Sequence, residues 1–395
     1  MNTKYNSFYF TKEDPDYSIK GSRDPLGFQV LWQHQGRRLV PYLSTVSINL
    51  QDFQILCLAH YFWAKEPDKK FAAFFFRFEQ LMAYVRVNTK GDLGFNGVDR
   101  VRKKVAESSK VSISNTKEDE ILANQRAYGI WGKYNRPFRE IGFATHKDFH
   151  SIFEAKLNAL EELSYVNKVV KKIIDSDKAE FKLEALQPLE ELLTVTAPER
   201  AFYSETILKV NIADPYQNRL LDFIEANKIP KDFQLYSFLK DFSKSLYSNE
   251  SILKEILKEI EYTERVLCPA NTIFRYLQTE PVWDKNKINA DKYINQCKSG
   301  INYTFHGEDG SIKNNLALAL TKSNWELVKD LEALNKSTSE KRGGAPWMKL
   351  NGDVLEVFHA EGNYKDEDFN PELNYNNGYF LNNYVNLYKQ ITASK

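Results

Sequence analysis

The chain has 395 residues, of which 42% are apolar and 27% carry a charge at neutral pH. That length exceeds what one hydrophobic core usually supports, and the composition is that of a folded protein. The 54 lysines and arginines nearly balance the 53 aspartates and glutamates. No field of the whole molecule therefore steers it toward nucleic acid or a membrane, and any charged surface must be local.

The three cysteines are Cys57, Cys268 and Cys297, which are far apart in the sequence and form no CxxC pair. This pattern argues against a disulfide framework and against a structural zinc site. We expect no cofactor and no metal ion.

A membrane span needs roughly 20 uninterrupted apolar residues. The most apolar segment, residues 71–85, is interrupted by Arg77, Glu79 and Gln80, and residues 1–16 contain no apolar leader segment. We therefore expect a cytoplasmic protein without membrane contact.

The beginning of the chain predicts two turns that flank short apolar runs. Asp24, Pro25 and Gly27 supply the chemistry of the first turn, and residues 33–38 form the second. Between the turns, residues 28–32 predict a short strand or a helical turn. Pairing of Asp24 with Arg23 or Arg37 would hold these turns in register, whereas an unpaired arginine would present a fork to a partner.

Two adjacent helices follow. Thr45 or Ser47 is expected to cap the first, whose apolar side chains recur at helical spacing from Phe53 to Tyr61. The second covers residues 71–85 and carries a phenylalanine-rich stripe. Their short charged connection predicts a helical hairpin with an aromatic core.

Basic residues gather in the next part of the chain, in residues 86–110 and 126–139, where tyrosine, tryptophan and phenylalanine are interleaved. Lysine and arginine suit phosphate groups, and aromatic rings suit base stacking. The alternative explanation is a solvated helix face with arginines paired inside the protein. The candidate nucleic-acid-binding residues are Arg100, Arg102, Lys103, Lys104, Lys133, Arg136 and Arg139.

The polar run at residues 108–120 predicts an exposed loop. Ser151 and Glu154 predict a capping box, and residues 176–182 are expected to break the helical pattern that follows. Pro198 is expected at the first position of a helix, where proline is tolerated. Further helices are predicted at residues 231–247, at residues 250–266 and from Pro269 onward.

The sequence pattern changes near the C-terminus. Residues 300–305 alternate as a strand does, Ser323 and Glu326 mark the start of a helix, and residues 337–346 predict a loop.

The strongest hairpin signal is Asn351-Gly352, which lies between alternating apolar residues. Residues 353–372 are acidic and suit a basic partner surface. A final helix is predicted at residues 380–391.

Motifs for catalysis are incomplete. The glycines at 91–97 fit neither a GKS/T loop nor GxGxxG and predict a loop between helices. His146 and His150 have the spacing of two metal ligands on a helix, with no third ligand nearby.

Lys349, Asp353 and Glu356 could be arranged as in a metal-dependent nuclease, but their place around an Asn-Gly turn is better explained by an exposed hairpin. We therefore predict no catalytic residue and favour a non-enzymatic role.

Three segments, SRDPLGFQVLW at 22–32, GRRLVPYLSTVS at 36–47 and APWMKLNGDVLEV at 345–357, resemble uncharacterised bacterial proteins of anti-phage defence loci. The resemblance implies a prokaryotic helical component that works beside an ATPase, a helicase or a nuclease.

We predict a mainly α protein of two or three lobes with a small β-hairpin element near the C-terminus. The expected regions are an aromatic-rich helical region with the basic segment at 1–150, a central helical region at 151–299, and an α+β region at 300–395. The leading function is a subunit or adaptor of a multi-protein assembly that binds other subunits and contacts DNA or RNA. The alternatives are a stand-alone nucleic-acid-binding protein and a metal-dependent nuclease.

Overall fold

The computed structural model describes residues 24–66, 70–88, 94–209, 215–227, 233–359 and 365–393. This part of the chain is mainly helical and contains two small antiparallel sheets, one of them near the C-terminus, which confirms the predicted fold class.

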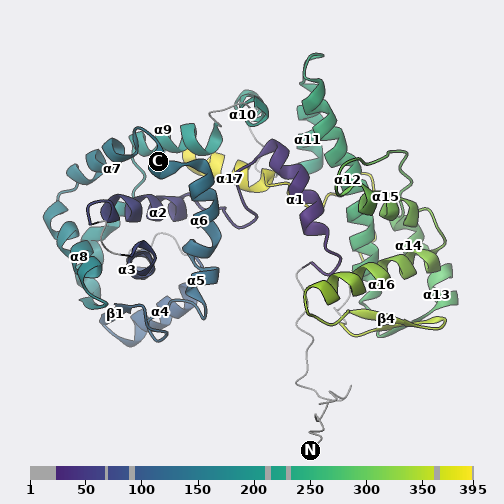
Figure 1. The fold of residues 1–395 in the computed structure, drawn as a ribbon, viewed down its shortest axis with the longest axis horizontal. Coiled ribbons are helices and arrows are strands. Elements are labelled where there is room, and N and C mark those ends of the chain that lie inside the picture. Colours follow the sequence, from purple (N-terminus) through teal and green to yellow (C-terminus); the bar gives the residue numbers. More distant parts are fainter. Residues whose placement is uncertain are drawn as a thin grey trace, which may run out of the picture. The chain divides into compact units, whose positions relative to one another are not determined.

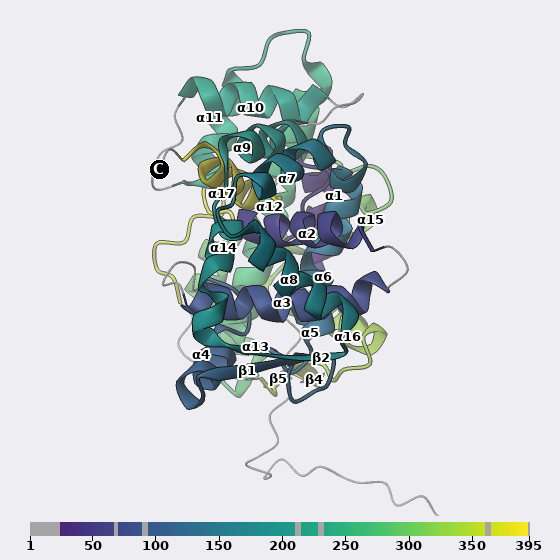
Figure 2. The same cartoon turned by 90° about the vertical axis from the view of Figure 1, so that its left-hand side faces the viewer.

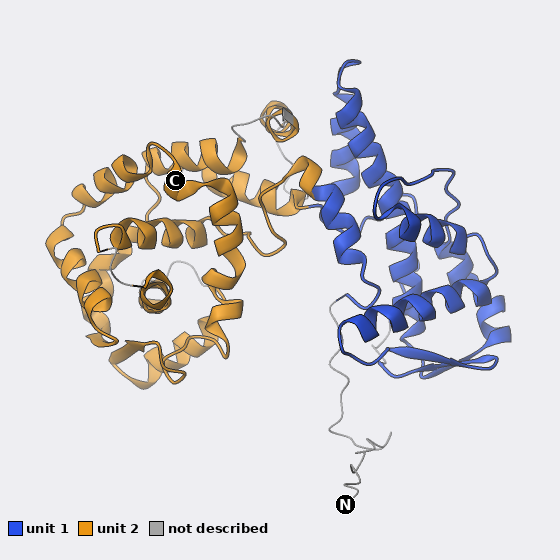
Figure 3. Ribbon diagram, viewed as in Figure 1, with its two compact units in different colours: residues 1–36, 234–379 blue, residues 37–233, 380–395 orange. Residues whose placement is uncertain are grey.

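The chain forms two compact units (Figure 3). Unit 1 comprises residues 1–36 and 234–379, and unit 2 comprises residues 37–233 and 380–395. Each unit joins segments that are distant in sequence, whereas the three predicted regions are consecutive and remain a division by sequence pattern.

Unit 2 is built around α3 (Phe71–Asn88), which lies beside α2 (Leu50–Trp63). Figure 1 views α3 almost end-on with α2 beside it, and Figure 2 shows the same pair from another side. Twelve of the 18 residues of α3 are buried, so this helix is covered nearly all round. The predicted helical hairpin and its aromatic core are confirmed.

The other elements of unit 2 surround or flank this pair. They are α4 (Val98–Glu107), β1 (Lys110–Ser114), α5 (Gln125–Tyr128), α6 (Ile130–Ile141), η1 (Phe143–Thr145), α7 (Phe149–Asn158), α8 (Leu163–Asp175), β2 (Lys178–Lys182), η2 (Leu183–Leu193), α9 (Ala197–Tyr203), the π-helical turn η3 (Ser204–Leu208), α10 (Pro215–Asn227) and α17 (Leu381–Thr392). The final helix is therefore confirmed as α17.

The sheet of unit 2 corrects one prediction and agrees with another. Residues 108–120 were expected to be a loop, but residues 110–114 form β1. The expected helix break at 176–182 is confirmed, because α8 ends at Asp175; β2 follows and pairs antiparallel with β1, with Lys110 opposite Lys182. Val111 and Ile113 are buried, whereas Lys110 is exposed and Ser112 is half-buried. The alternation in each strand covers only a few residues, and the strand that pairs with it is far away in the sequence. The pattern of either segment alone therefore did not identify a strand.

Unit 1 begins with α1 (Phe28–Leu39), a helix of 12 residues where the sequence predicted a short strand or a helical turn; the last residues of α1 belong to unit 2. The other elements of unit 1 are α11 (Leu235–Lys244), α12 (Ser251–Leu277), β3 (Val282–Asp284), α13 (Lys285–Ala290), α14 (Lys292–Cys297), α15 (Gly310–Ala319), α16 (Asn324–Lys341), β4 (Met348–Asn351) and β5 (Val354–Val357). The strands form a sheet in the order β3-β5-β4, and its β4–β5 hairpin confirms the Asn351-Gly352 signal.

Two predicted boundaries in unit 1 are wrong. Helix α16 extends to Lys341, into the predicted loop at 337–346. Helix α12 runs without a break through Pro269. A proline inside a helix leaves the carbonyl of the residue four positions earlier without its usual donor. Here the Ser299 hydroxyl donates to the Arg265 carbonyl at 2.6 Å, which satisfies that group.

Residues 300–305 are not a strand. Ile301, Tyr303 and Phe305 do alternate toward the core of unit 1. The Asn314 side chain, however, bonds both the N–H and the carbonyl of Phe305 at 2.9 Å, in place of a neighbouring strand. The alternation therefore reflects burial without sheet pairing.

Helix caps are predicted only in part. Asn49 caps α2, in place of Thr45 or Ser47, because its side-chain oxygen accepts from the Gln51 N–H at 2.9 Å. Helix α7 begins at Phe149, so the expected capping box of Ser151 and Glu154 is wrong.

Two other helix starts agree with the sequence. Pro198 lies in the first turn of α9, which Thr196 and Glu199 begin with a capping box. Ser323 caps α16, since its hydroxyl accepts from the Glu326 N–H.

The core of unit 1 provides a direct test of strand β3. We expect Trp283→Ala to lower the free energy of unfolding by about 3–5 kcal/mol. The indole is 1% exposed, and its Nε1 donates to the Leu277 carbonyl at 2.9 Å. Val282→Ala is the matched control, because that side chain is 53% exposed and should change stability by less than about 0.5 kcal/mol. Chemical denaturation checks both, and equal losses would contradict the orientation of β3.

Candidate functional site

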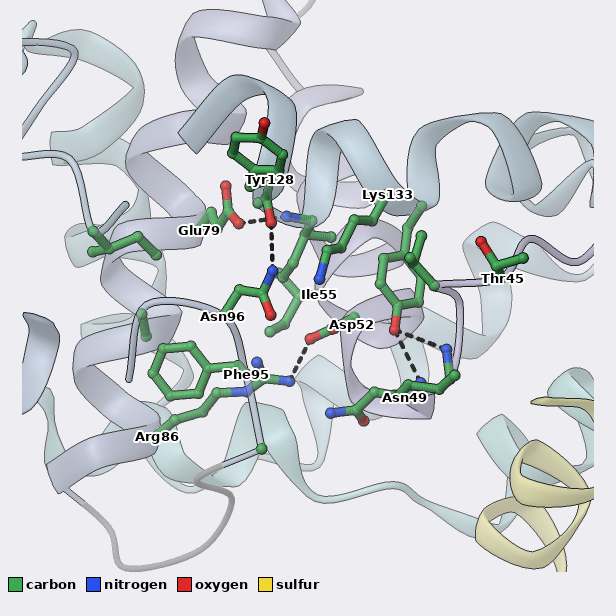
Figure 4. Close-up of a pocket in the computed structure, with 18 residues that line it drawn as sticks. Thr45, Asn49, Asp52, Ile55, Glu79, Arg86, Phe95, Asn96, Tyr128 and Lys133 are labelled. Carbon is green, nitrogen blue, oxygen red and sulfur yellow. Dashed lines mark hydrogen bonds and ion pairs between the residues drawn. The ribbon is translucent and has the colours of Figure 1, made fainter. Parts of the chain in front are cut away.

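Unit 2 contains a cavity of about 170 Å³ between α2, α3 and α6 (Figure 4). Glu79, Ala83 and Arg86 line it from α3, at the spacing of one helix face. The other lining residues are Thr45, Val46, Ile48, Asn49, Asp52, Ile55, Gly94, Phe95, Asn96, Ile121, Tyr128, Gly129, Ile130, Lys133 and Tyr134. The mixture of acids, bases and amides makes this cavity the candidate site of the unit.

A buried ion pair forms one wall. The Arg86 Nη2 donates to Asp52 Oδ1 at 2.8 Å, and its Nε donates to Gln51 Oε1 at the same distance. The guanidinium also lies 5.2 Å from the ring centroid of Phe95. The Arg86 side chain is 1% exposed and that of Asp52 11%. Removal of one partner would leave a buried charge unpaired, so the pair fixes α3 against α2.

Glu79 lies on the opposite side of the cavity floor, one turn before Ala83 on α3. Its Oε1 accepts from the Ile130 N–H at 2.6 Å, and its Oε2 accepts from Gln125 Nε2 at 2.9 Å. Burial raises the pKa of this carboxyl from 4.5 to about 7; the charge of Asp52 also raises it, while the two hydrogen bonds and Arg86 act in the other direction. A carboxyl that titrates near neutral pH is suited to acid–base chemistry, but here both oxygens hold the α5–α6 junction.

Gly129 makes the close approach at this junction possible. A Cβ atom there would lie 2.5 Å from Glu79 Oε1 and 2.5 Å from the Gln125 carbonyl oxygen. Any larger residue would displace the carboxylate or the backbone, so only glycine fits at this position.

Tyr134 ties α6 to the start of α2. Its hydroxyl accepts from the N–H groups of Ile48 and Asn49 at 3.1 and 2.9 Å. Burial, with the nearby charge of Asp52, raises the pKa of this phenol. The hydroxyl therefore stays neutral and satisfies helix-terminal donors that the chain would otherwise bury.

The predicted basic residues lie on two helices. Arg100, Arg102, Lys103 and Lys104 belong to α4, and Lys133, Arg136 and Arg139 belong to α6. Of these seven, Lys133 lines the cavity.

Several of these side chains are held by local partners. Arg102 pairs with Asp99 at 3.5 Å, Lys103 with Glu107 at 3.9 Å and Arg136 with Glu140 at 2.8 Å. The Lys104 Nζ donates to the Glu118 carbonyl at 2.8 Å. Exposed pairs of this kind contribute about 0–1 kcal/mol to stability. The basic side chain can therefore leave its acid and bind a phosphate instead.

The acids and the arginine that line the cavity were not predicted from the sequence. In the sequence, Glu79 only interrupts an apolar run, and nothing there connects Arg86 with Asp52. The available signal was their position: charges on the inner face of two apolar helices must find partners when they are buried.

The remaining motifs do not form one site. The His146 ring contacts Phe202, and the His150 ring contacts Tyr61. Within the described residues, no group of three or more His, Cys, Asp or Glu side chains could hold a metal ion.

The carboxylates of the C-terminal hairpin have lysine neighbours. Asp353 pairs with Lys285 at 3.1 Å, and Glu356 lies opposite Lys349 in the β4–β5 register. This arrangement fits an exposed hairpin.

The cysteines are buried and unlinked. Burial raises the pKa of the Cys297 thiol to about 12 and raises those of Cys57 and Cys268 as well, so these thiols stay protonated.

Asp24 caps α1, since its carboxylate accepts from the N–H groups of Phe28 and Gln29 at 2.8 and 3.2 Å. It also pairs with Arg342 at 2.8 Å, a partner that the sequence did not indicate. Arg23 and residues 91–93 of the glycine-rich segment lie outside the described residues.

Comparisons of the chain with protein-family models, with curated proteins and with solved structures give no match. The resemblance to proteins of defence loci therefore stays a prediction. Among the helices that the structure describes, none combines the length and apolar character of a membrane span.

The pKa of Glu79 predicts a pH dependence of stability. The folded state holds this proton more tightly than the unfolded state, so the contribution of Glu79 is fully present below pH 4.5 and is lost as the pH rises through about 7. The free energy of unfolding should fall by about 3 kcal/mol over that range. Glu79→Gln cannot ionise and should remove this decline.

Urea denaturation of both proteins from about pH 5 to about pH 8 measures the effect as a difference at each pH. His60, whose pKa burial lowers from 6.5 to about 4, titrates with the opposite sign and contributes equally to both proteins. Parallel pH curves for the two proteins would contradict the burial of an ionisable Glu79.

Proposed function

We propose that the protein is a non-enzymatic subunit or adaptor of a prokaryotic multi-protein assembly, and that unit 2 contacts nucleic acid through α5 and α6. The observation that supports this most strongly is Tyr128. Its side chain is 60% exposed, yet the residue lines the same cavity as Lys133. An exposed aromatic ring beside a cation is the arrangement on which an unpaired base stacks.

Further basic residues lie on the two helices that carry Tyr128 and Lys133. Arg126 and Arg139 are exposed, and within the described residues neither guanidinium has an ion pair with an acid. Arg136 lies on the same helix as Arg139, one turn before it. These cations can neutralise phosphates on either side of a stacked base.

Helix α4 supplies a second group of cations. Arg100, Arg102 and Lys103 are exposed there. We assign them to the phosphates of the same ligand or of its complementary strand. The acids that pair with Arg102 and Lys103 are exposed, so these ion pairs contribute little to stability. Breaking them to bind a phosphate therefore costs little free energy.

The protein partners are proposed from chemistry and from the resemblance. Asp366, Glu367 and Asp368 lie in the acidic segment 353–372 and are exposed, which suits a basic surface of another subunit. The resemblance to defence-locus proteins points to an ATPase, a helicase or a nuclease as that subunit, in the cytoplasm of a prokaryote.

Fluorescence anisotropy with labelled single-stranded DNA and RNA tests the nucleic-acid contact. Tyr128→Ala should weaken binding roughly 5- to 150-fold, which is the loss of one stacked base. Arg126→Ala and Arg139→Ala should each reduce the slope of log K against log salt by about 0.7. Tyr247→Ala is the control, because that tyrosine is 72% exposed in unit 1.

Salt-dependent binding by the isolated protein would favour a stand-alone binder over an adaptor that needs its partners. Binding that survives all three unit 2 substitutions in folded protein would show that α5 and α6 are not the contact surface.

A further inference from the structure

A groove of about 460 Å³ lies along α11 and α12 in unit 1. The two helices are consecutive in the chain and pack against each other (Figure 1). Leu239 and Leu257, both buried, form its apolar floor. This groove belongs to neither the cavity nor the basic helices of unit 2.

Lysines line both sides of the groove. Lys240 and Lys244 come from α11, and Lys254 and Lys258 come from α12. Each pair has a spacing of four residues, which places both side chains on one helix face about 6 Å apart along the axis. The two lysine pairs therefore flank the same short length of groove.

The charge of this groove is poorly neutralised by the protein. Lys244 pairs with Asp241 at 3.1 Å, and both side chains are exposed. Within the described residues, the other three lysines form no ion pair: Lys240 donates to the Tyr236 hydroxyl, and Lys258 lies over the Tyr303 ring.

One acid, Glu261, lines the groove, and it pairs with Arg265 at 3.8 Å. Four ammonium groups around an apolar floor attract a ligand that carries several negative charges.

Two tyrosines line the groove near the beginning of α11. The Tyr236 ring packs edge-on against the Tyr375 ring at 5.4 Å, at the beginning of α11. Burial raises the pKa of Tyr375, so its hydroxyl keeps its proton. At the other end, the connection between α11 and α12 follows Lys244. The groove is thus short, and its cations are concentrated over about one helical turn.

We propose that this groove binds the oligophosphate group of a small molecule, either a free chain of linked phosphates or the phosphates of a nucleotide. Linked phosphates place several charges within the short span of the lysines, whereas an extended nucleic-acid strand would spread them along a longer track. Lysine binds phosphate as a point charge, and the hydroxyl of Ser243, which also lines the groove, is suited to donate a hydrogen bond to a phosphate oxygen.

Isothermal titration calorimetry of the full chain with inorganic tripolyphosphate, ATP and inorganic phosphate in metal-free buffer tests the proposal. We expect tripolyphosphate and ATP to bind more tightly than inorganic phosphate. Equal affinity for the first two indicates a free oligophosphate, and tighter binding of ATP indicates a nucleotide whose ring contacts Tyr236. Either result supports the oligophosphate site.

The double variant Lys240→Gln with Lys258→Gln should weaken tripolyphosphate binding about tenfold or more. The control is Lys329→Gln with Lys336→Gln, two exposed lysines of α16 in the same unit that remove the same charge and should leave binding within about twofold. Circular dichroism confirms that both variants fold.

Equal weakening by the two double variants, or no binding of tripolyphosphate and ATP by the unmodified chain, would overturn the proposal. Binding of a single-stranded oligonucleotide that is lost with Lys240 and Lys258, without oligophosphate binding, would overturn it as well. Because every residue involved lies in unit 1, this outcome is separate from the Tyr128 test in unit 2.

Discussion

The arrangement of unit 2 depends on four polar side chains buried in its central helix α3. Arg77, Glu79, Gln80 and Arg86 are at most 4% exposed. Arg77 donates to a carbonyl of α8, Glu79 accepts from the start of α6, Gln80 exchanges hydrogen bonds with β1, and Arg86 pairs with α2. A buried charge or amide without a partner costs several kcal/mol. Each surrounding element therefore satisfies these groups in only one position along α3. Apolar packing alone would fix that position less strictly.

The buried polar groups that hold unit 2 together are distinct from the exposed groups proposed to bind a ligand. Glu79 and Arg86 shape the cavity, but their oxygens and nitrogens are used by partners within the chain. The groups that remain available to a ligand lie outside the interior: Tyr128 and the arginines of α5 and α6 in unit 2, and the lysine groove in unit 1. The nearly equal numbers of acidic and basic residues mean that the molecule as a whole is not strongly basic. They still permit local basic surfaces of this kind.

The sequence predicted what short-range patterns determine. Helical spacing of apolar residues located α2, α3, α16 and α17, and Asn351-Gly352 located the hairpin. It failed where the partner is distant. Strands β1 and β2 are short and become regular only when Lys110 meets Lys182. The continuity of α12 depends on Ser299, which replaces the donor that Pro269 removes. The cavity escaped prediction for the same reason, because an ion pair between α2 and α3 requires the helices to be in contact first.

A double-mutant cycle on Arg86 and Asp52 tests the central claim that interior charges hold α3 in place. We expect Arg86→Met alone to lower the free energy of unfolding by about 3–5 kcal/mol, because Asp52 then remains buried without its partner. The double variant Asp52→Asn with Arg86→Met should lose about 1–3 kcal/mol less than the sum of the single variants. Additive losses, with no coupling between the two sites, would contradict the account.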